Sequence, residues 1–154
     1  MVVAYDVKER SKVTEVFKQA QMYNLTIVRT WAFNDNPGNF SLQSSPGVYD
    51  QTMFQAVLTR NNTISGVVYK DDPTIMAWEL MNEPRCPSDV SGNTLKKWIA
   101  EMAGYLKSID ANHLLEVGLE GFYNPSNGYK NQGLPYYQVG TDFISKNQIP
   151  EIDF

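Results

Sequence analysis

An alternation of strand-like and helix-like segments is the feature that most constrains the fold. Residues 74–82 form an apolar run typical of a buried strand, and residues 113–122 form a second one. Between them, residues 95–109 carry apolar side chains at three- and four-residue steps, which indicates an amphipathic helix. Because strands that alternate with helices usually pair in parallel, we predict an α/β fold around a parallel sheet.

The segments before residue 74 continue this alternation. They predict a helix over residues 6–24, a strand over residues 25–33, a long loop over residues 34–47 and a helix over residues 49–60.

Beyond residue 122, a polar loop leads to a predicted short helix over residues 141–146 and to the start of a strand at residues 149–154. No linker or repeat interrupts the chain, so we expect one domain over residues 1–154.

Charge and hydropathy exclude several classes of partner. The net charge is -4 and no basic run could neutralise a string of phosphates, so we expect no nucleic-acid partner. No segment has the roughly 18 unbroken apolar residues of a membrane span, so we expect no membrane partner. Cys86 is the only cysteine and His113 the only histidine, and we therefore predict no metal and no cofactor.

Signals for the compartment point in two directions. Acceptor sequons for N-glycosylation begin at Asn24, Asn39 and Asn61, which favours secretion. The first ten residues, MVVAYDVKER, have no long apolar stretch, so we expect no signal peptide in this chain.

Polar and aromatic side chains gather where the predicted strands end, which is where α/β folds bind ligands. These residues are Arg29, Trp31, Asn82, Glu83, Arg85, Glu120 and Phe122. Each also has a structural interpretation: the arginines as surface charges, the aromatic residues as packing, and Glu120 as a loop carboxylate.

Glu83 is the strongest catalytic candidate, because a carboxylate at the end of so apolar a strand costs free energy unless partners or a raised pKa offset it. A partly dry carboxyl group is suited to be a general acid. Glu79, four residues earlier, is the internal rival, and we interpret it as a buried structural carboxylate beneath the site. Strict alternation places Glu83 and Asn82 on opposite faces, so both reach one ligand only if the strand bends.

Several segments also carry a family resemblance. WELMNEPRC, with RTWAF upstream and HLLEVGLEGFY downstream, is similar to plant endo-β-1,4-mannanases of glycoside hydrolase family 5. YKDDPTIMAWELMNEPRC and VGTDFISKNQIPEIDF agree with the same family in order along nearly the whole chain. The resemblance implies a (β/α)8 TIM barrel.

The resemblance also implies an activity and roles for the residues at the strand ends. Enzymes of this family hydrolyse mannans, galactomannans and glucomannans with retention, using two glutamates about 5 to 5.5 Å apart. Glu83 matches the acid/base and Asn82 a contact to the sugar on the nucleophile side. Arg29 matches the arginine that ends the second strand, and Arg85 a position on the leaving-group side. Trp31 and Glu120 match positions near the cleft.

Parts of the family pattern are missing from the 154 residues. The nucleophile glutamate and a His-x-Tyr pair would follow Phe154, and the first strand would precede Met1. Near residues 55–56 the chain also lacks a helix, the third strand and a long loop. Since such a barrel needs about 250 residues, we expect a partial barrel that lacks several strands and is inactive by itself.

Other interpretations stay open. The chain could be a non-catalytic sugar-binding remnant that uses Trp31, Arg29 and Arg85, an unstable open sheet, or a cellulase-type member of the same family. The resemblance implies a polysaccharide partner, mannan, and a secreted protein of the extracellular space or cell wall. It leaves the oligomeric state undetermined.

Overall fold

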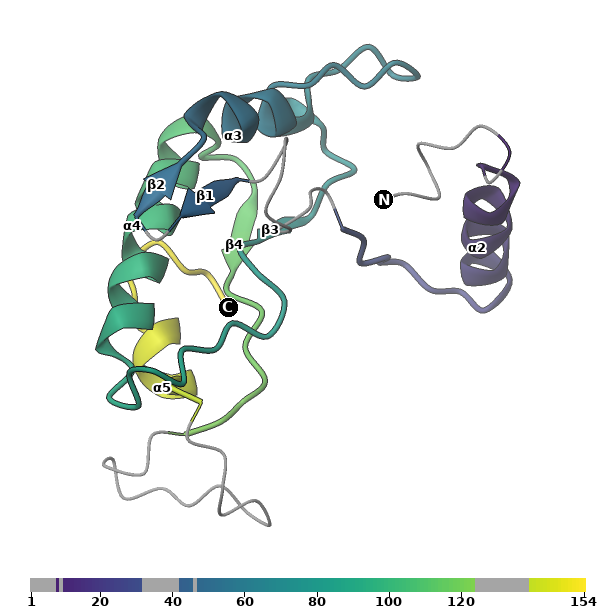
Figure 1. Cartoon of the computed structure of the whole chain (residues 1–154). Helices are drawn as coiled ribbons and strands as arrows, with labels where there is room; N and C mark the ends of the chain where they lie inside the picture. The colour runs from purple at the N-terminus through teal and green to yellow at the C-terminus, as the bar shows by residue number, and fades with distance from the viewer. Residues whose placement is uncertain (1–7, 9, 32–41, 46, 124–138) are drawn as a thin grey trace. The chain divides into compact units, whose positions relative to one another are not determined.

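The computed structural model describes residue 8 and residues 10–31, 42–45, 47–123 and 139–154 (Figure 1). The chain divides into two compact units, Met1–Arg60 and Asn61–Phe154, and each is described by itself.

Helix α2, Arg10–Met22, opens the described part of the first unit and confirms the predicted helix over most of its length. It ends where Asn24 adopts a left-handed backbone with φ 55°. The N–H of Asn24 then donates to Gln21 O at 3.0 Å, and the N–H of Leu25 to Ala20 O at 2.9 Å. This pair of bonds is a Schellman end, which satisfies carbonyls that the last turn leaves unpaired.

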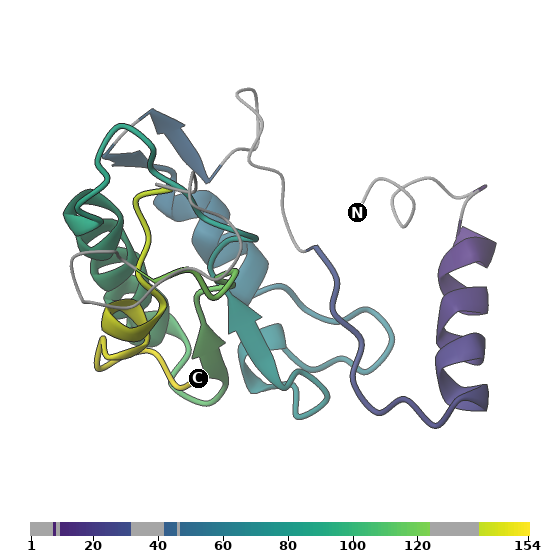
Figure 2. The same cartoon turned by 90° about the horizontal axis from the view of Figure 1, so that it is seen from below.

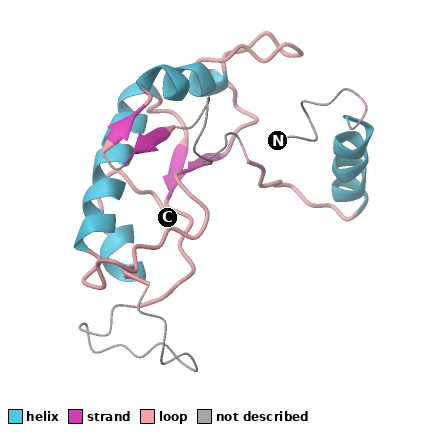
Figure 3. Cartoon of the chain, in the orientation of Figure 1, coloured by secondary structure: helices cyan, strands magenta, loops and turns pink. Residues whose placement is uncertain are grey.

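The strand predicted for residues 25–33 is wrong over residues 25–31, which form a loop (Figure 3). The β-branched and aromatic content suggested a strand, but a strand exists only where a neighbour supplies ladder hydrogen bonds. In the described part of the chain, no strand pairs with this segment. Leu25, Ile27 and Val28 are exposed as a result. Residues 32 and 33 lie outside the described residues.

A small hairpin occupies part of the predicted loop. Strands β1, Gln43–Ser45, and β2, Val48–Tyr49, pair antiparallel. Helix α3, Gln51–Leu58, follows and confirms the predicted helix. The side chain of Asp50 caps it by accepting a hydrogen bond from Met53 N at 3.1 Å.

The second unit is built around a parallel strand pair. Strands β3, Ala77–Glu79, and β4, Leu114–Glu116, are paired in the register Trp78↔Leu115, and Figure 2 shows their arrows side by side and pointing the same way. Helix α4, Asn93–Ile109, connects them. This βαβ arrangement confirms the parallel α/β prediction for this part of the chain.

Two short helical elements flank the strand pair. The 3-10 helix η1, Tyr69–Asp71, precedes β3, and helix α5, Phe143–Asn147, follows β4 and contacts α4. The core of this unit consists of the inward face of α4 together with apolar residues of β4 and the chain end. Its buried members include Leu95, Ile99, Met102, Ala103, Leu106, Leu115, Val117, Ile149 and Ile152.

The chain end departs from prediction, because residues 149–154 form a turn and an irregular segment instead of a strand. Asp153 lies beside β4: its N–H donates to Leu115 O at 2.9 Å, and its carboxylate accepts from Leu115 N at 2.8 Å. Lys107 Nζ holds the same carboxylate at 2.7 Å, and its hydrogen bond is the main cause that lowers the pKa of Asp153. The carboxylate of Asp153 thus accepts the hydrogen bond that a backbone carbonyl of a neighbouring strand would otherwise accept.

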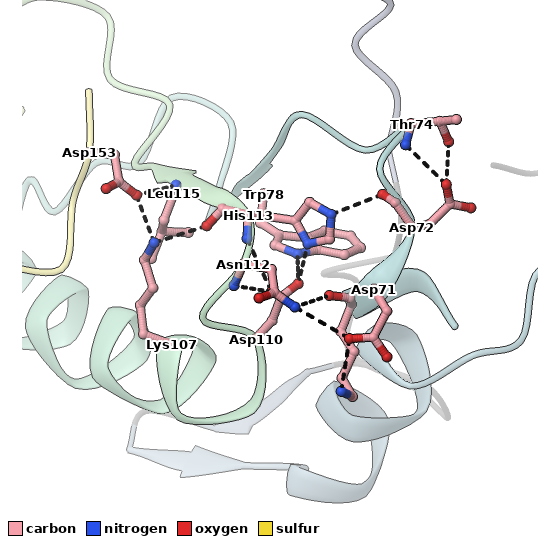
Figure 4. Close-up of polar contacts among 11 residues, drawn as sticks. Asp71, Asp72, Thr74, Trp78, Lys107, Asp110, Asn112, His113, Leu115 and Asp153 are labelled. Atoms are coloured by element: carbon pink, nitrogen blue, oxygen red, sulfur yellow. Dashed lines mark hydrogen bonds and ion pairs between the residues drawn. The ribbon is translucent and has the colours of Figure 1, made fainter. Parts of the chain in front are cut away.

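A buried polar network lies at the amino ends of β3 and β4 (Figure 4). Asp110, 1% exposed, accepts from Trp78 Nε1 at 2.7 Å and lies 2.6 Å from His113 Nδ1. The other ring nitrogen of His113 lies 3.0 Å from Asp72 O. Burial raises the pKa of Asp110, but the hydrogen bonds from Trp78 and His113 outweigh it, so the net direction is downward.

Candidate active site

Backbone pairing between the two parallel strands continues past β3 as far as Glu83. Leu80 N donates to Glu116 O at 3.0 Å, and Met81 N to Val117 O at 3.3 Å. Glu83 N then donates to Gly118 O at 2.9 Å. Glu83 is therefore tied to the segment that follows β4, at the carboxyl end of the parallel pair.

The backbone turns sharply at Glu83, whose φ is 52°. A left-handed conformation is uncommon for a residue other than glycine, and it costs on the order of 1–3 kcal/mol. The buried ring of Pro84 and the bond to Gly118 O hold the turn in place. This is the bend that the sequence required if Asn82 and Glu83 are to serve one ligand, and strain of this kind is a reason to look for function.

Glu83 does not lie in the partly dry setting that its apolar strand suggested, because its side chain is 55% exposed. Leu80, three residues before it, is buried, but Glu83 itself lies past the strand and is exposed.

Glu79 is half-buried, so the prediction of a buried carboxylate is wrong in degree. It lies against Gly118, where a Cβ would meet Glu79 Oε1 at 2.3 Å and Met81 O at 2.2 Å. Because Gly118 also accepts the hydrogen bond from Glu83 N, Glu79 lies next to the turn as predicted.

Arg85 and Glu120 form a two-pronged ion pair that links the ends of the two strands. Arg85 Nε donates to Glu120 Oε2 at 2.6 Å, and Arg85 Nη2 donates to Glu120 Oε1. The same Nη2 lies 3.8 Å from Glu83 Oε2. Arg85 thus lies between two carboxylates, and its planar fork fixes the direction of the Glu120 side chain.

The predicted site residues fall in both units. Glu83, Arg85 and Glu120 come together in the second unit, with Asn82 half-buried beside them in the chain. Arg29 and Trp31 belong to the first unit, where the guanidinium carbon lies 5.6 Å from the Trp31 ring centroid. Phe122 contributes its backbone, since Phe122 O accepts from Phe143 N at 2.8 Å.

Sequence reasoning missed two close-packed glycines, Gly118 and Gly140. The signal for Gly118 was present in part, because glycine inside a strand-like run often marks a close approach of another backbone. No comparable local signal marks Gly140, whose neighbours come from a distant loop.

The described residues contain no cluster of three or more His, Cys, Asp or Glu side chains suited to hold a metal ion. Within the same residues, every helix is too short or too polar to cross a membrane.

Comparison with known proteins places the chain in a family. Residues 51–133 match the family described as "GH family 5 beta-mannosidase-like". The whole chain is 42% identical to mannan endo-1,4-beta-mannosidase 4 of Solanum lycopersicum and covers 54% of it. It is 41% identical to mannan endo-1,4-beta-mannosidase 7 of Arabidopsis thaliana and covers 51% of it.

Solved structures agree with these relatives. The endo-beta-1,4-mannanase of Thermotoga petrophila matches 67% of this chain with a TM-score of 0.62 and 42% identity, and 23% of its own chain is covered. The endo-1,4-beta-mannanase of Rhizomucor miehei matches 74% with a TM-score of 0.57 and 36% identity, and 36% of it is covered.

The chain spans about half the length of the curated relatives it matches. The match to the tomato protein runs over 219 aligned residues, so 65 aligned positions lie opposite gaps in these 154 residues. The chain belongs to the family 5, β-mannosidase-like glycoside hydrolases, and its strands and helices are part of a TIM barrel.

Proposed function

We propose that the protein acts in retaining endo-hydrolysis of β-1,4-mannosidic linkages in mannans, galactomannans and glucomannans, with Glu83 as the acid/base. The observation that carries this proposal is the strained turn at φ 52°, which sets the Glu83 carboxylate beyond the carboxyl end of the parallel pair. Arg85 lies 3.8 Å from that carboxylate and reaches the same end. Relatives named as mannan endo-1,4-beta-mannosidases support the choice of substrate.

In this mechanism Glu83 protonates the leaving glycosidic oxygen, while Asn82 and Arg85 offer N–H donors to sugar hydroxyls. A second carboxylate must attack the anomeric carbon. Glu120 does not suit that role, because both its oxygens accept hydrogen bonds from Arg85. Glu120 is instead a binding residue that orients Arg85. We therefore propose that these 154 residues supply the acid/base half of the site.

A mannan hydrolysis assay on the purified 154-residue polypeptide tests this division of roles. We expect no release of mannooligosaccharides from the polypeptide alone, because no glycosyl-enzyme intermediate forms without a nucleophile. Release that disappears in Glu83→Gln would contradict the claim that the other half is required. Release that persists in Glu83→Gln would remove Glu83 from the mechanism.

A second candidate function is sugar binding without hydrolysis, favoured by the exposed Trp31. Its side chain is 57% exposed, and Arg29 lies over its ring, which leaves an aromatic face and a donor group in reach of a sugar. Calorimetric titration with mannohexaose and cellohexaose tests it and separates the mannanase from the cellulase-type alternative. We expect Trp31→Ala to weaken binding of mannohexaose, and Tyr23→Ala, at a more exposed aromatic residue of the same unit, to leave it unchanged.

We also propose that the protein is secreted and glycosylated. Asn24 and Asn61 both begin sequons and are exposed, and Asn39 lies outside the described residues. Asn62 is not an acceptor, because Ile64 stands where a sequon requires Ser or Thr. Expression through a eukaryotic secretory pathway should give a mass shift that a glycosidase removes. Its absence in the wild type would contradict the proposal, and Thr26→Ala and Thr63→Ala assign the sites.

The 65 unmatched positions support an internal deletion, which we place near residues 55–56. That junction lies inside α3, whose hydrogen bonds continue across it, since Thr59 N donates to Gln55 O at 2.8 Å. The segments before and after the proposed junction would thus form one continuous helix, although they were separate in the ancestral barrel. Sequencing the gene and its transcript around codons 55 and 56 tests this placement.

A further inference from the structure

Residues 139–143, which we name the clamp segment, are bonded to both loops that carry the Arg85–Glu120 pair. Cys86 N, directly after Arg85, donates to Val139 O at 2.8 Å. At the other end of the clamp segment, Phe143 N donates to Phe122 O at 2.8 Å, two residues after Glu120. The segment therefore connects the two strand ends through backbone bonds, independently of the ion pair.

Gly140 lets the clamp segment press directly onto the loop after Arg85. A Cβ built on Gly140 would lie 2.1 Å from Cys86 O and 2.6 Å from Asp89 O, and its φ is 65°. Both obstacles are backbone atoms, so a side chain at this position can be accommodated only if the loop moves.

The loop that Gly140 touches is itself rigidly built. Asp89 N donates to Cys86 O at 3.0 Å, and Gly92 N donates to Asp89 O at 3.1 Å. The Asp89 carboxylate accepts from Ser91 and Thr94, and these hydrogen bonds hold its pKa well below the usual range. Because these hydrogen bonds make the loop rigid, we expect a displacement of Cys86 to move the whole loop.

Lys146 lies against the far end of the same loop. It is 1% exposed, and a Cβ on Gly92 would lie only 2.8 Å from its Nζ. Burial lowers the pKa of Lys146, and the charge of Asp142 acts in the opposite direction. Burial of an ammonium group removes its hydration, and this costs free energy unless nearby groups of the protein replace the lost interactions with water.

We propose that Gly140 is a positioning residue for the site. By holding the Cys86–Gly92 loop against the clamp segment, with Lys146 at its far end, it sets the Arg85 guanidinium in register with Glu120 and so aims it at the sugar. The two-pronged ion pair fixes how the Arg85 and Glu120 side chains face each other, but it does not place the two loops that carry them, so the backbone has to supply the register. The step from register to sugar binding rests on the proposed function.

The Arg85 Nε–H resonance in a ¹⁵N–¹H NMR spectrum reports this register, because an N–H bonded to a carboxylate exchanges slowly with water. The signal that disappears in Arg85→Lys is assigned to Arg85. Glu120→Gln removes the carboxylate and shows how the spectrum looks when the ion pair is absent. We expect Gly140→Ala to lose it as Glu120→Gln does. The matched control is Gly66→Ala, which has φ 75° and nothing within 4 Å of the new Cβ, and we expect it to keep the signal. A signal that survives in Gly140→Ala would overturn the proposal.

The indole N–H of Trp78, bonded to Asp110 at the other end of the strands, shows whether the unit stays folded. If Gly140→Ala loses both signals, unfolding of the unit would explain the result, and Lys146→Met then separates a role in the clamp from a role in stability. This variant keeps the buried aliphatic stem of Lys146 and removes only its charge. Loss of the Arg85 signal alone supports the clamp. Retention of both signals, or loss of both, overturns it, because the segment would then have no role beyond stability.

Titration with mannohexaose tests the last step separately. We expect Gly140→Ala to bind about tenfold more weakly than Gly66→Ala, the loss typical of one charged hydrogen bond. If the wild type does not bind, the proposed function fails, and the NMR experiment still decides the clamp.

Discussion

The two ends of the β3–β4 pair differ in how their charges are held. At the amino ends, Asp110 and His113 are buried, and the Asp110 carboxylate is bonded to Trp78 Nε1, Asn112 N and His113 Nδ1 (Figure 4). At the carboxyl ends, Glu83 is exposed on a left-handed backbone beside Arg85. The amino ends contribute to stability through satisfied hydrogen bonds, whereas the carboxyl ends carry a strained backbone at a candidate catalytic residue. TIM barrels separate stability from chemistry in the same way.

Removing the carboxylate at the amino end should have the largest effect on stability. Asp110→Ala leaves Trp78 Nε1, His113 Nδ1 and two backbone N–H groups without their acceptor. We expect a loss of about 3 kcal/mol in the free energy of unfolding, measured by urea denaturation. Asp71→Asn, at a carboxylate that is 48% exposed, is the control and should cost less than about 1 kcal/mol. Similar losses for the two would abolish the distinction between the ends.

The same carboxylate should make stability depend on acid pH. Its pKa is lowered in the folded chain, so the folded state releases a proton that the unfolded state still holds. Its contribution is therefore present above the unfolded pKa of about 3.9 and is lost as pH falls further. We expect denaturation curves recorded between pH 6 and pH 3 to show a steeper fall for the wild type than for Asp110→Ala. Parallel curves would contradict the assignment.

A pair of glycines tests how tightly the carboxyl end is built. Gly118 and Gly121 share φ 84°, but only Gly118 has atoms, Met81 O and Glu79 Oε1, where a Cβ would lie. Both alanine variants carry the backbone strain of about 1 kcal/mol, and Gly118→Ala should lose roughly a further 1–3 kcal/mol from the clash. Equal free energies of unfolding for the two variants would show that Glu79 and the strand end yield readily.

The smallest expected effect is a gain in stability at Glu83. Glycine adopts a positive φ without strain, so Glu83→Gly should be more stable than Glu83→Ala by about 0.5–1 kcal/mol, after the greater freedom of glycine in the unfolded chain is counted. Thermal unfolding of the two variants measures it. An alanine variant as stable as the glycine variant would mean that the turn at Glu83 stores no strain.

The prediction succeeded where the signal was local and repeated. The apolar spacing from Leu95 to Leu106 predicts α4, and the two flanking strand-like runs predict a parallel pair. It failed at residues 25–31, where composition favoured a strand that only a neighbour could have stabilised. It placed Arg85 and Glu120 at the strand ends but not in contact, because they are 35 residues apart and pair only through the register of β3 with β4.

Local periodicity and matching segments are enough to predict the α-helices, the polar residues that follow the strands and the family resemblance. Three features emerge only in the folded chain: Glu83 is exposed on a left-handed turn, Arg85 binds Glu120, and Gly140 meets the loop after Arg85. Exposure, ion pairing and close approach are properties of distances between residues far apart in the chain, and those distances exist only once the strands have paired.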